Sequence, residues 1–250
     1  MKTVIESNAA YHSSNEYVGS STLKTIHKKS VYHAVNRLQT EPTPAMLLGS
    51  AIHAKVLEPK TFDDEFLLIE KLDLRYNADK EKKKEYEASG KILIQPKDGE
   101  LIDNVYDSVV SNPFAAQYLV GDIELSHYTT FMDVKVKVRP DVKGKDFIAD
   151  LKTCQDNSPR AFRSDVFKYG YHIQAAFYCM VLGYPVESFK FIAVETNHPY
   201  TTEVYTLSEE MIEMGIADMV NALDKWKEYK QTGEVKLYDL PRLDDGSILI

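Results

Sequence analysis

The chain has 250 residues, of which 44% are hydrophobic and 27% are charged, and its net charge is −8. These values are ordinary for a globular protein with one large domain or two small ones. The acidic balance argues against a protein that simply coats nucleic acid, so a nucleic-acid enzyme of this composition has to gather its cations locally.

Cysteine content and hydropathy exclude several further classes. Two cysteines, Cys154 and Cys179, cannot form a disulfide scaffold or a four-cysteine zinc or iron–sulfur site within one chain. No apolar run approaches the roughly 20 residues of a membrane span, and the N-terminus lacks the apolar region of a signal peptide. We therefore expect a cytoplasmic protein with no membrane partner.

The first half of the sequence predicts mainly helices. Ser20 or Ser21 can cap a helix that runs toward Ser30, and a helix over 45–57 ends before Pro59. The next elements are a short strand and three helices, expected at 66–69, 78–89, 98–110 and 114–119.

The period of the hydrophobic pattern then changes from helix to strand. A strand is expected over 123–131, and in 134–139 valines at even positions alternate with Lys135, Lys137 and Arg139. The valines should face the core, so the three cations form a basic stripe that we interpret as a guide for a phosphate backbone. The alternative is an ordinary solvated strand face.

The strand expected over 147–152 carries the most chemistry. Asp150 and Lys152 are two residues apart and share a face, whereas Leu151 points into the core with its carbonyl at the strand edge. Asp141 ends the preceding strand, so two carboxylates, a carbonyl and an ammonium can converge. Oxygen ligands of this kind suit Mg²⁺ or Mn²⁺, and a lysine suits a phosphate or an attacking water.

The last third of the chain alternates helices with strands. A helix over 171–182 places Gln174 and Tyr178 on one face because they are four residues apart. Ser208 is expected to cap a long C-terminal helix. The remaining elements are a helix opened by Ser158 and Pro159 and strands at 189–194 and 204–207.

This order of elements predicts an α/β fold, with a mixed central sheet flanked by helices and a helical N-terminal extension. No internal repeat or long linker divides the chain, so we expect one domain over 1–250. Its parts are a mainly helical segment, a sheet core, and a C-terminal helix with tail, at 1–119, 120–207 and 208–250.

Four patches of the sequence carry a family likeness: Ser20–Lys24, Leu48–Ala54, Arg139–Lys152, and Tyr171–Gln174 with Tyr178. In this order and at these spacings they resemble the PD-(D/E)xK nuclease superfamily and, more closely, the RecE-type exonucleases (exodeoxyribonuclease VIII) of bacteria and phages. The likeness covers nearly the whole chain and implies a restriction-endonuclease-like core. The length of 250 residues resembles a compact phage or prophage version.

The resemblance assigns roles that the residue pattern alone leaves open. A lone histidine on a buried helix is usually a core residue, but in the family the histidine at the position of His53 binds metal. Gln174 and Tyr178 are expected to orient the substrate phosphate. A serine near Ser21 helps to hold the DNA 5′-phosphate in the family, and a helix N-terminus suits an anion. Lys24, and more weakly Arg37, are further DNA-binding candidates.

For the metals, we expect two Mg²⁺ ions per site, with Mn²⁺ as a substitute. Asp141, Asp150 and the Leu151 carbonyl would hold one ion, and His53 with a shared carboxylate would hold a second, weaker one. Lys152 would position or deprotonate the attacking water.

An acid on the first core strand is a further candidate ligand. Relatives often carry one near the metals, and Glu124 is the strongest choice for that role here. Asp122 and Asp133 compete for it.

The resemblance also implies a substrate and partners. RecE-type enzymes degrade the 5′ strand of linear double-stranded DNA and leave 3′ tails that a RecT-like single-strand-annealing recombinase coats. They work as homo-oligomeric rings, here a trimer or tetramer, in the cytoplasm of a bacterium or phage-infected cell.

Two alternatives remain at this point. One is a RecB-like or Cas4-like nuclease of other polarity, although no helicase motif or cysteine cluster is present. The other is a catalytically silent protein that binds DNA ends, and the complete set of site residues argues against it. Polarity, processivity, oligomer size and the need for a 5′-phosphate stay open.

Overall fold

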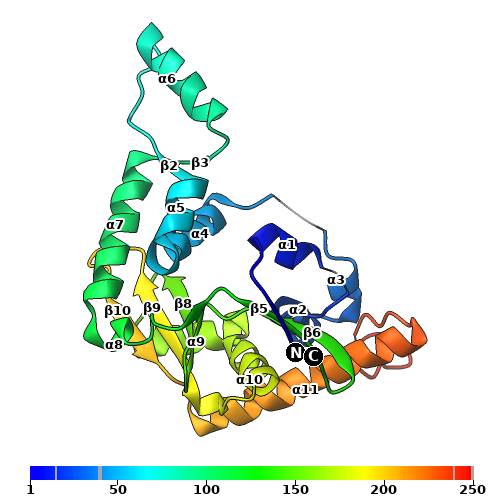
Figure 1. Cartoon of the computed structure of the whole chain (residues 1–250). Helices are drawn as coiled ribbons and strands as arrows, with labels where there is room; N and C mark the ends of the chain where they lie inside the picture. Colours follow the sequence, from blue (N-terminus) through cyan, green and yellow to red (C-terminus); the bar gives the residue numbers. More distant parts are fainter. Residues whose placement is uncertain (15, 39–40, 239, 249–250) are drawn as a thin grey trace.

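The centre of the molecule is a five-stranded mixed sheet with the strand order β10–β9–β8–β7–β4 (Figure 1). The computed structural model describes residues 1–14, 16–38, 41–238 and 240–248. The central pair, β8 and β9, is parallel, and the other pairs are antiparallel. The strands are β4 (Asp122–Ile123), β7 (Val142–Lys143), β8 (Ile148–Cys154), β9 (Phe189–Glu195) and β10 (Thr202–Tyr205).

Helices cover both faces of this sheet, because alternate residues of β8 and β9 are apolar on both sides. Ile148, Phe191 and Ala193 face a core that includes residues of α2, α9, α10 and α11. Leu151 and Ile192 face a second core with residues of α4 and α7. These helices are α2 (Ser20–Lys28), α4 (Pro44–Leu57), α7 (Pro96–Ser111), α9 (Pro159–Tyr169), α10 (Tyr171–Leu182) and α11 (Glu209–Thr232), and a short 3₁₀ turn, η1 (Val186–Ser188), precedes β9.

A second sheet, β1–β5–β6, stands beside the first and anchors the N-terminal segment. Its strands are β1 (Lys2–Val4), β5 (Ser126–Phe131) and β6 (Val134–Val138), and the short helices α1 (Asn8–Ser13) and α3 (Val31–Val35) lie in the same N-terminal segment. Val18 pairs with Val136 as an isolated bridge just before α2 begins. The start of α2 is thereby fixed to β6.

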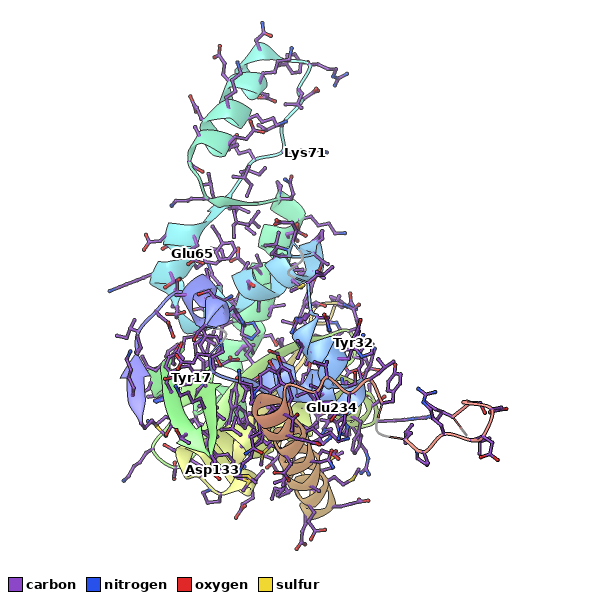
Figure 2. The ribbon with its side chains drawn as sticks, turned by 90° about the vertical axis from the view of Figure 1, so that its right-hand side faces the viewer. Tyr17, Tyr32, Glu65, Lys71, Asp133 and Glu234 are labelled. Carbon is purple, nitrogen blue, oxygen red and sulfur yellow. The ribbon has the colours of Figure 1, made fainter. Side chains whose placement is uncertain are left out.

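An arm projects from the α4–α7 side of the molecule (Figures 1 and 2). The arm consists of α6 (Asn77–Ala88), which buries none of its residues, and rests on the parallel pair β2 (Phe66–Leu68) and β3 (Ile92–Ile94). Two short helices, α5 (Pro59–Glu65) and α8 (Pro113–Ala116), complete the chain. None of the described helices combines the length and apolarity needed to cross a bilayer.

Most expected elements are present, and three differences matter for the site. The strand expected over 123–131 is two strands in two sheets, β4 and β5, because Glu124 between them has φ +49°. The segment before Val18 contains α1, a helix that is not among the expected elements, and α1 buries Tyr11. The cap of α2 is Gly19, so neither Ser20 nor Ser21 is the cap.

The expected basic stripe on β6 is wrong for its central residue. Lys137 is buried, and its ammonium donates to the carbonyls of Tyr11 and Ser14 at 2.5 and 2.7 Å. Lys135 is exposed and pairs with Glu16. The valines do face the core as expected, but α1 and the residues after it cover the opposite face of β6 at Lys137.

Lys137→Ala should therefore lower stability, whereas Lys135→Ala should not. Loss of the ammonium leaves the buried Tyr11 carbonyl and the partly buried Ser14 carbonyl without this donor, which costs about 1–3 kcal/mol. The exposed pair of Lys135 is worth less than about 1 kcal/mol. Urea denaturation of both variants measures this difference, and equal unfolding free energies would contradict the structural role of Lys137.

Gly215→Ala should also destabilise the protein. A Cβ atom at Gly215 of α11 would lie 2.5 Å from the backbone oxygen of His172 in α10. Overpacking of this kind costs about 1–3 kcal/mol, and the gain in helix propensity returns only about 0.5–1 kcal/mol. Gly49→Ala in α4 is the matched control, since its Cβ would meet only Thr153 Oγ1 at 3.9 Å. The control should keep or raise the urea midpoint, and the same result for Gly215→Ala would refute tight α10–α11 packing.

Candidate active site

The site forms where β7 stops pairing with β8. Val142 of β7 is opposite Ala149 of β8, and Asp141 immediately precedes Val142. Beyond Ala149, none of the described strands pairs with the β7 side of β8. The Asp141 carboxylate takes the place of that strand and accepts a hydrogen bond from the Leu151 backbone N–H at 2.7 Å.

His53 approaches the same edge from α4. Its Nδ1 faces the Gly49 carbonyl at 2.9 Å, one helical turn earlier. Its Nε2 lies 2.8 Å from the Leu151 carbonyl and 3.3 Å from Asp141 Oδ2. The imidazole thus joins the carbonyl and the carboxylate that the sequence places at this edge, as expected.

Asp150 lies on the other face of β8, toward α10. It is only 2% exposed, and one of its carboxylate oxygens pairs with the Lys152 ammonium. The other accepts a hydrogen bond from the Gln174 side-chain amide of α10. Alternation along β8 therefore brings Asp150 and Lys152 together, as the sequence predicts.

A second lysine reaches this group from α2. Lys24 Nζ donates to Gln174 Oε1 at 3.3 Å, and Lys152 Nζ lies 3.5 Å from the same oxygen. Gly170, with φ +67°, makes room for the Lys24 side chain, because a Cβ there would lie 3.0 Å from Lys24 Cγ. Burial and the neighbouring Lys152 lower the pKa of Lys24 to about 8.

Two tyrosines of α10 line the same group. The Lys152 ammonium lies 4.7 Å from the centre of the Tyr171 ring, a cation–π contact that sequence reasoning missed. Tyr178 hydrogen-bonds with Ser20 at the start of α2, and burial raises its pKa to about 12. Both hydroxyls keep their protons at neutral pH, so they can donate hydrogen bonds. Tyr171 is one turn before Gln174, and that helical spacing was the available signal.

Glu124 lies at the rim of the site next to Asp141. Its backbone N–H donates to the Asp141 carbonyl at 3.1 Å, and its carboxylate pairs with Arg139 at 2.8 Å. Burial and the charge of Asp141 raise the pKa of Glu124 to about 8. The competing acids have other partners. Asp122 is exposed and pairs with Lys143, and Asp133, in the β5–β6 turn (Figure 2), is exposed and pairs with Lys227 of α11.

The buried carboxylates are balanced by cations. Burial alone would raise the pKa of Asp141, but His53, Lys152 and the Leu151 N–H hold it below its usual value. Burial and Asp141 raise the pKa of Asp150, and Lys152 opposes that rise. Burial would lower the pKa of His53, but Asp141 raises it to about 9.

The donor set fits a divalent cation in kind. Carboxylate and carbonyl oxygens are the ligands that Mg²⁺ and Mn²⁺ take. Oδ2 of Asp150 is buried and contacts the Lys152 ammonium. The acids at this site do not bring three ligand atoms within 4.8 Å of one another. Among the described residues, the one such group consists of His27, His172 and Asp218, which lie outside this site.

A cavity of about 450 Å³ opens beside the site. It is lined by α4 at Leu48 and Gly49, by the end of β8 at Thr153, and by Tyr169 and Tyr171 around the α9–α10 junction. Gly49 and Tyr171 also contact His53 and Lys152, so this cavity adjoins the catalytic candidates.

The remaining DNA-binding candidates differ in their exposure and in their contacts. Ser21 is exposed, and the buried serine that contacts Tyr178 is its neighbour Ser20. Arg37 is exposed, and its charge contributes to the lowered pKa of Lys24. Arg139 is held by Glu124, and Asn8 accepts a hydrogen bond from it. Ser20 was missed because the serine next to it fitted the family pattern equally well.

Comparisons with known proteins bear on the fold and the family of this chain. The chain resembles the crystal structure of a "Putative exonuclease" from Eubacterium rectale, with a TM-score of 0.62 and 14% sequence identity. The alignment covers 95% of this chain and 91% of that one, so the two chains share a fold. No curated protein sequence gives a significant match. Residues 19–236 match the model of the PDDEXK-like domain of unknown function (DUF3799), so the chain belongs to that family.

Proposed function

We propose that this protein is a metal-dependent exonuclease that degrades the 5′ strand of linear double-stranded DNA. The observation that carries the proposal is the group around Leu151. Asp141, His53 and the Leu151 carbonyl meet at the edge of β8, and Asp150 pairs with Lys152 on the adjoining face. Hydrolysis of a phosphodiester needs positive charge on the phosphate and an activated water. Each of these needs has a matching residue here.

The metal ligands would be Asp141, Asp150 and the Leu151 carbonyl, with His53 beside them. We keep two Mg²⁺ ions as the expected complement, with Mn²⁺ as a substitute and Glu124 as an outer ligand. Such an ion supplies positive charge to the phosphate and a nucleophile at neutral pH. In the present arrangement His53 and Lys152 provide the positive charge around the two carboxylates.

Lys152 is the residue best placed to act on the reacting phosphate. Its ammonium is held between Asp150 and the Tyr171 ring, and the charges of Asp150 and Asp141 raise its pKa despite burial. It therefore stays protonated and can donate to a phosphate oxygen as negative charge develops. The cation–π contact with the Tyr171 ring helps to position this ammonium.

Gln174 fixes the positions of the charged groups. Its amide nitrogen donates to Asp150, and its amide oxygen accepts from Lys24. One side chain thus orients a metal-ligand candidate and a cation. Tyr178 and Ser20 complete a polar lining that can hold the scissile phosphate, as the family resemblance implies.

The biological setting belongs to the same proposal. The residues around Lys24 at the start of α2 would receive the DNA 5′ end, and Arg37 adds positive charge nearby. A homo-oligomeric ring, trimeric or tetrameric, would retain the DNA between turnovers. A RecT-like single-strand-annealing recombinase would then bind the exposed 3′ tail in the cytoplasm.

Substitutions at β8 should separate metal binding from turnover. Asp150→Asn should lose Mn²⁺ binding and nearly all activity. Lys152→Ala should keep Mn²⁺ binding but lose about 10²–10³-fold in rate, the usual cost of one transition-state donor. Mn²⁺ binding can be followed by electron paramagnetic resonance, and rate by release of acid-soluble nucleotides.

Asp122→Asn is the matched control for Asp150→Asn, since Asp122 is an exposed aspartate that pairs with Lys143 outside the site. It should retain both properties. A Lys152→Ala variant with wild-type turnover would remove Lys152 from the mechanism. Loss of both properties in Asp122→Asn would point to a general folding effect.

The polarity is tested with linear duplex DNA labelled separately at the 5′ and 3′ ends, with and without Mg²⁺. Prompt Mg²⁺-dependent release of the 5′ label, an intact closed circle and an inactive Asp150→Asn protein are expected. Release of the 3′ label would place the protein with nucleases of other polarity, and cutting of the circle would make it an endonuclease. No loss of DNA with Mg²⁺ or Mn²⁺ would leave a silent protein that binds DNA ends.

A further inference from the structure

Three metal-ligating side chains meet at the junction of α2, α10 and α11, apart from the group around Leu151. His27 Nδ1 lies 3.5 Å from Asp218 Oδ1, and His172 Nε2 lies 3.1 Å from Asp218 Oδ2. The three ligand atoms are all within 4.8 Å of one another. Each side chain comes from a different helix.

The local packing brings these groups together. Gly215 lets α11 approach the His172 backbone closely, and Asp218 follows it on the same helix by three residues. His27 packs edge-on against the His172 ring, with ring centres 6.0 Å apart. The arrangement therefore depends on a close helix contact and is not a chance meeting of flexible surface side chains.

His172 is prepared to act as a ligand. It is 2% exposed, and its Nδ1 faces the Val166 carbonyl at 3.2 Å. A carbonyl can only accept, so Nδ1 carries a proton. Nε2, which faces the Asp218 carboxylate, is the nitrogen that would bind a metal in place of a proton. A histidine that donates its second nitrogen to a backbone carbonyl is the usual form of a metal-bound histidine.

The donor set selects a class of metal. Two imidazole nitrogens and one carboxylate oxygen suit Zn²⁺ and related transition metals, whereas Mg²⁺ prefers oxygen ligands alone. Asp218 and His27 are 28% and 34% exposed, so solvent can reach the junction and supply a fourth ligand. Burial lowers the pKa of His27, and its neutral form is the one that binds metal.

We propose that His27, His172 and Asp218 form a Zn²⁺ site that ties α2 to α10 and α11. Lys24 is one turn before His27 on α2, and Gln174 follows His172 by two residues on α10. A metal at this junction would therefore fix the two helices that present Lys24 and Gln174 to each other. The site does not rest on the nuclease proposal, since its ligands are separate from those around Leu151.

The test measures Zn²⁺ binding by isothermal titration of tag-free, metal-depleted protein in excess Mg²⁺. The His53→Ala variant, which weakens Zn²⁺ binding at the candidate active site, should still bind about one Zn²⁺ per chain. The double variant His27→Ala/His53→Ala should bind that ion more than about 100-fold more weakly, because losing a direct ligand exceeds the 10–100-fold cost of an outer-shell change. The visible absorption of bound Co²⁺ should disappear in the same step.

Two further variants control for folding. His33→Ala with His53→Ala removes a half-buried histidine outside the junction and should leave Zn²⁺ binding unchanged. Asp218→Asn with His53→Ala should behave like the His27→Ala double variant, with an unchanged circular dichroism spectrum in the absence of metal. Undiminished Zn²⁺ binding after His27→Ala, or no Zn²⁺ binding by His53→Ala alone, would overturn the site and leave a hydrogen-bonded ion pair between His172 and Asp218.

Discussion

Two carboxylates lie at the centre of this protein, where β7 ends against β8. Asp141 precedes Val142, which is paired with Ala149, the neighbour of Asp150, and Asp150 is almost fully buried. The charge of Asp141 is close enough to raise the pKa of Asp150. Two neighbouring buried negative charges are costly unless cations and hydrogen-bond donors surround them. The arrangement of α4 and α10 follows from that need, since α4 delivers His53 to Asp141 and α10 delivers Gln174 to Asp150.

The N-terminal helices belong to the site and are not a separate extension of it. The bridge between Val18 and Val136 fixes the start of α2. Ser20, two residues after Val18, contacts Tyr178 of α10. Lys24 then reaches Gln174 across the α2–α10 contact. The packing of α2 on α10, supported by the junction at His172, thus decides whether the second lysine is in place.

Sequence reasoning succeeded where one element carries the information. The alternation in β8 placed Asp150 and Lys152 on one face, and the four-residue spacing in α10 placed Gln174 and Tyr178 on another. It failed where the outcome depends on distant segments. Lys137 was expected to be exposed because the residues that cover it, near Tyr11, are more than a hundred positions away in the sequence. The break in the strand at Glu124 was not predicted because its positive φ occurs at a residue other than glycine.

The pair of lysines offers the strongest physical indication of what the site accepts. Lys24 and Lys152 share one amide oxygen of Gln174, and their mutual repulsion, with burial, lowers the pKa of Lys24 to about 8. The free protein gains little from bringing two ammonium groups together, because the folded state must bear that repulsion. Perturbed groups of this kind concentrate at functional sites. A phosphate between the two lysines would remove the repulsion. Under the proposed function, this is where an acidic chain would attract an anionic backbone.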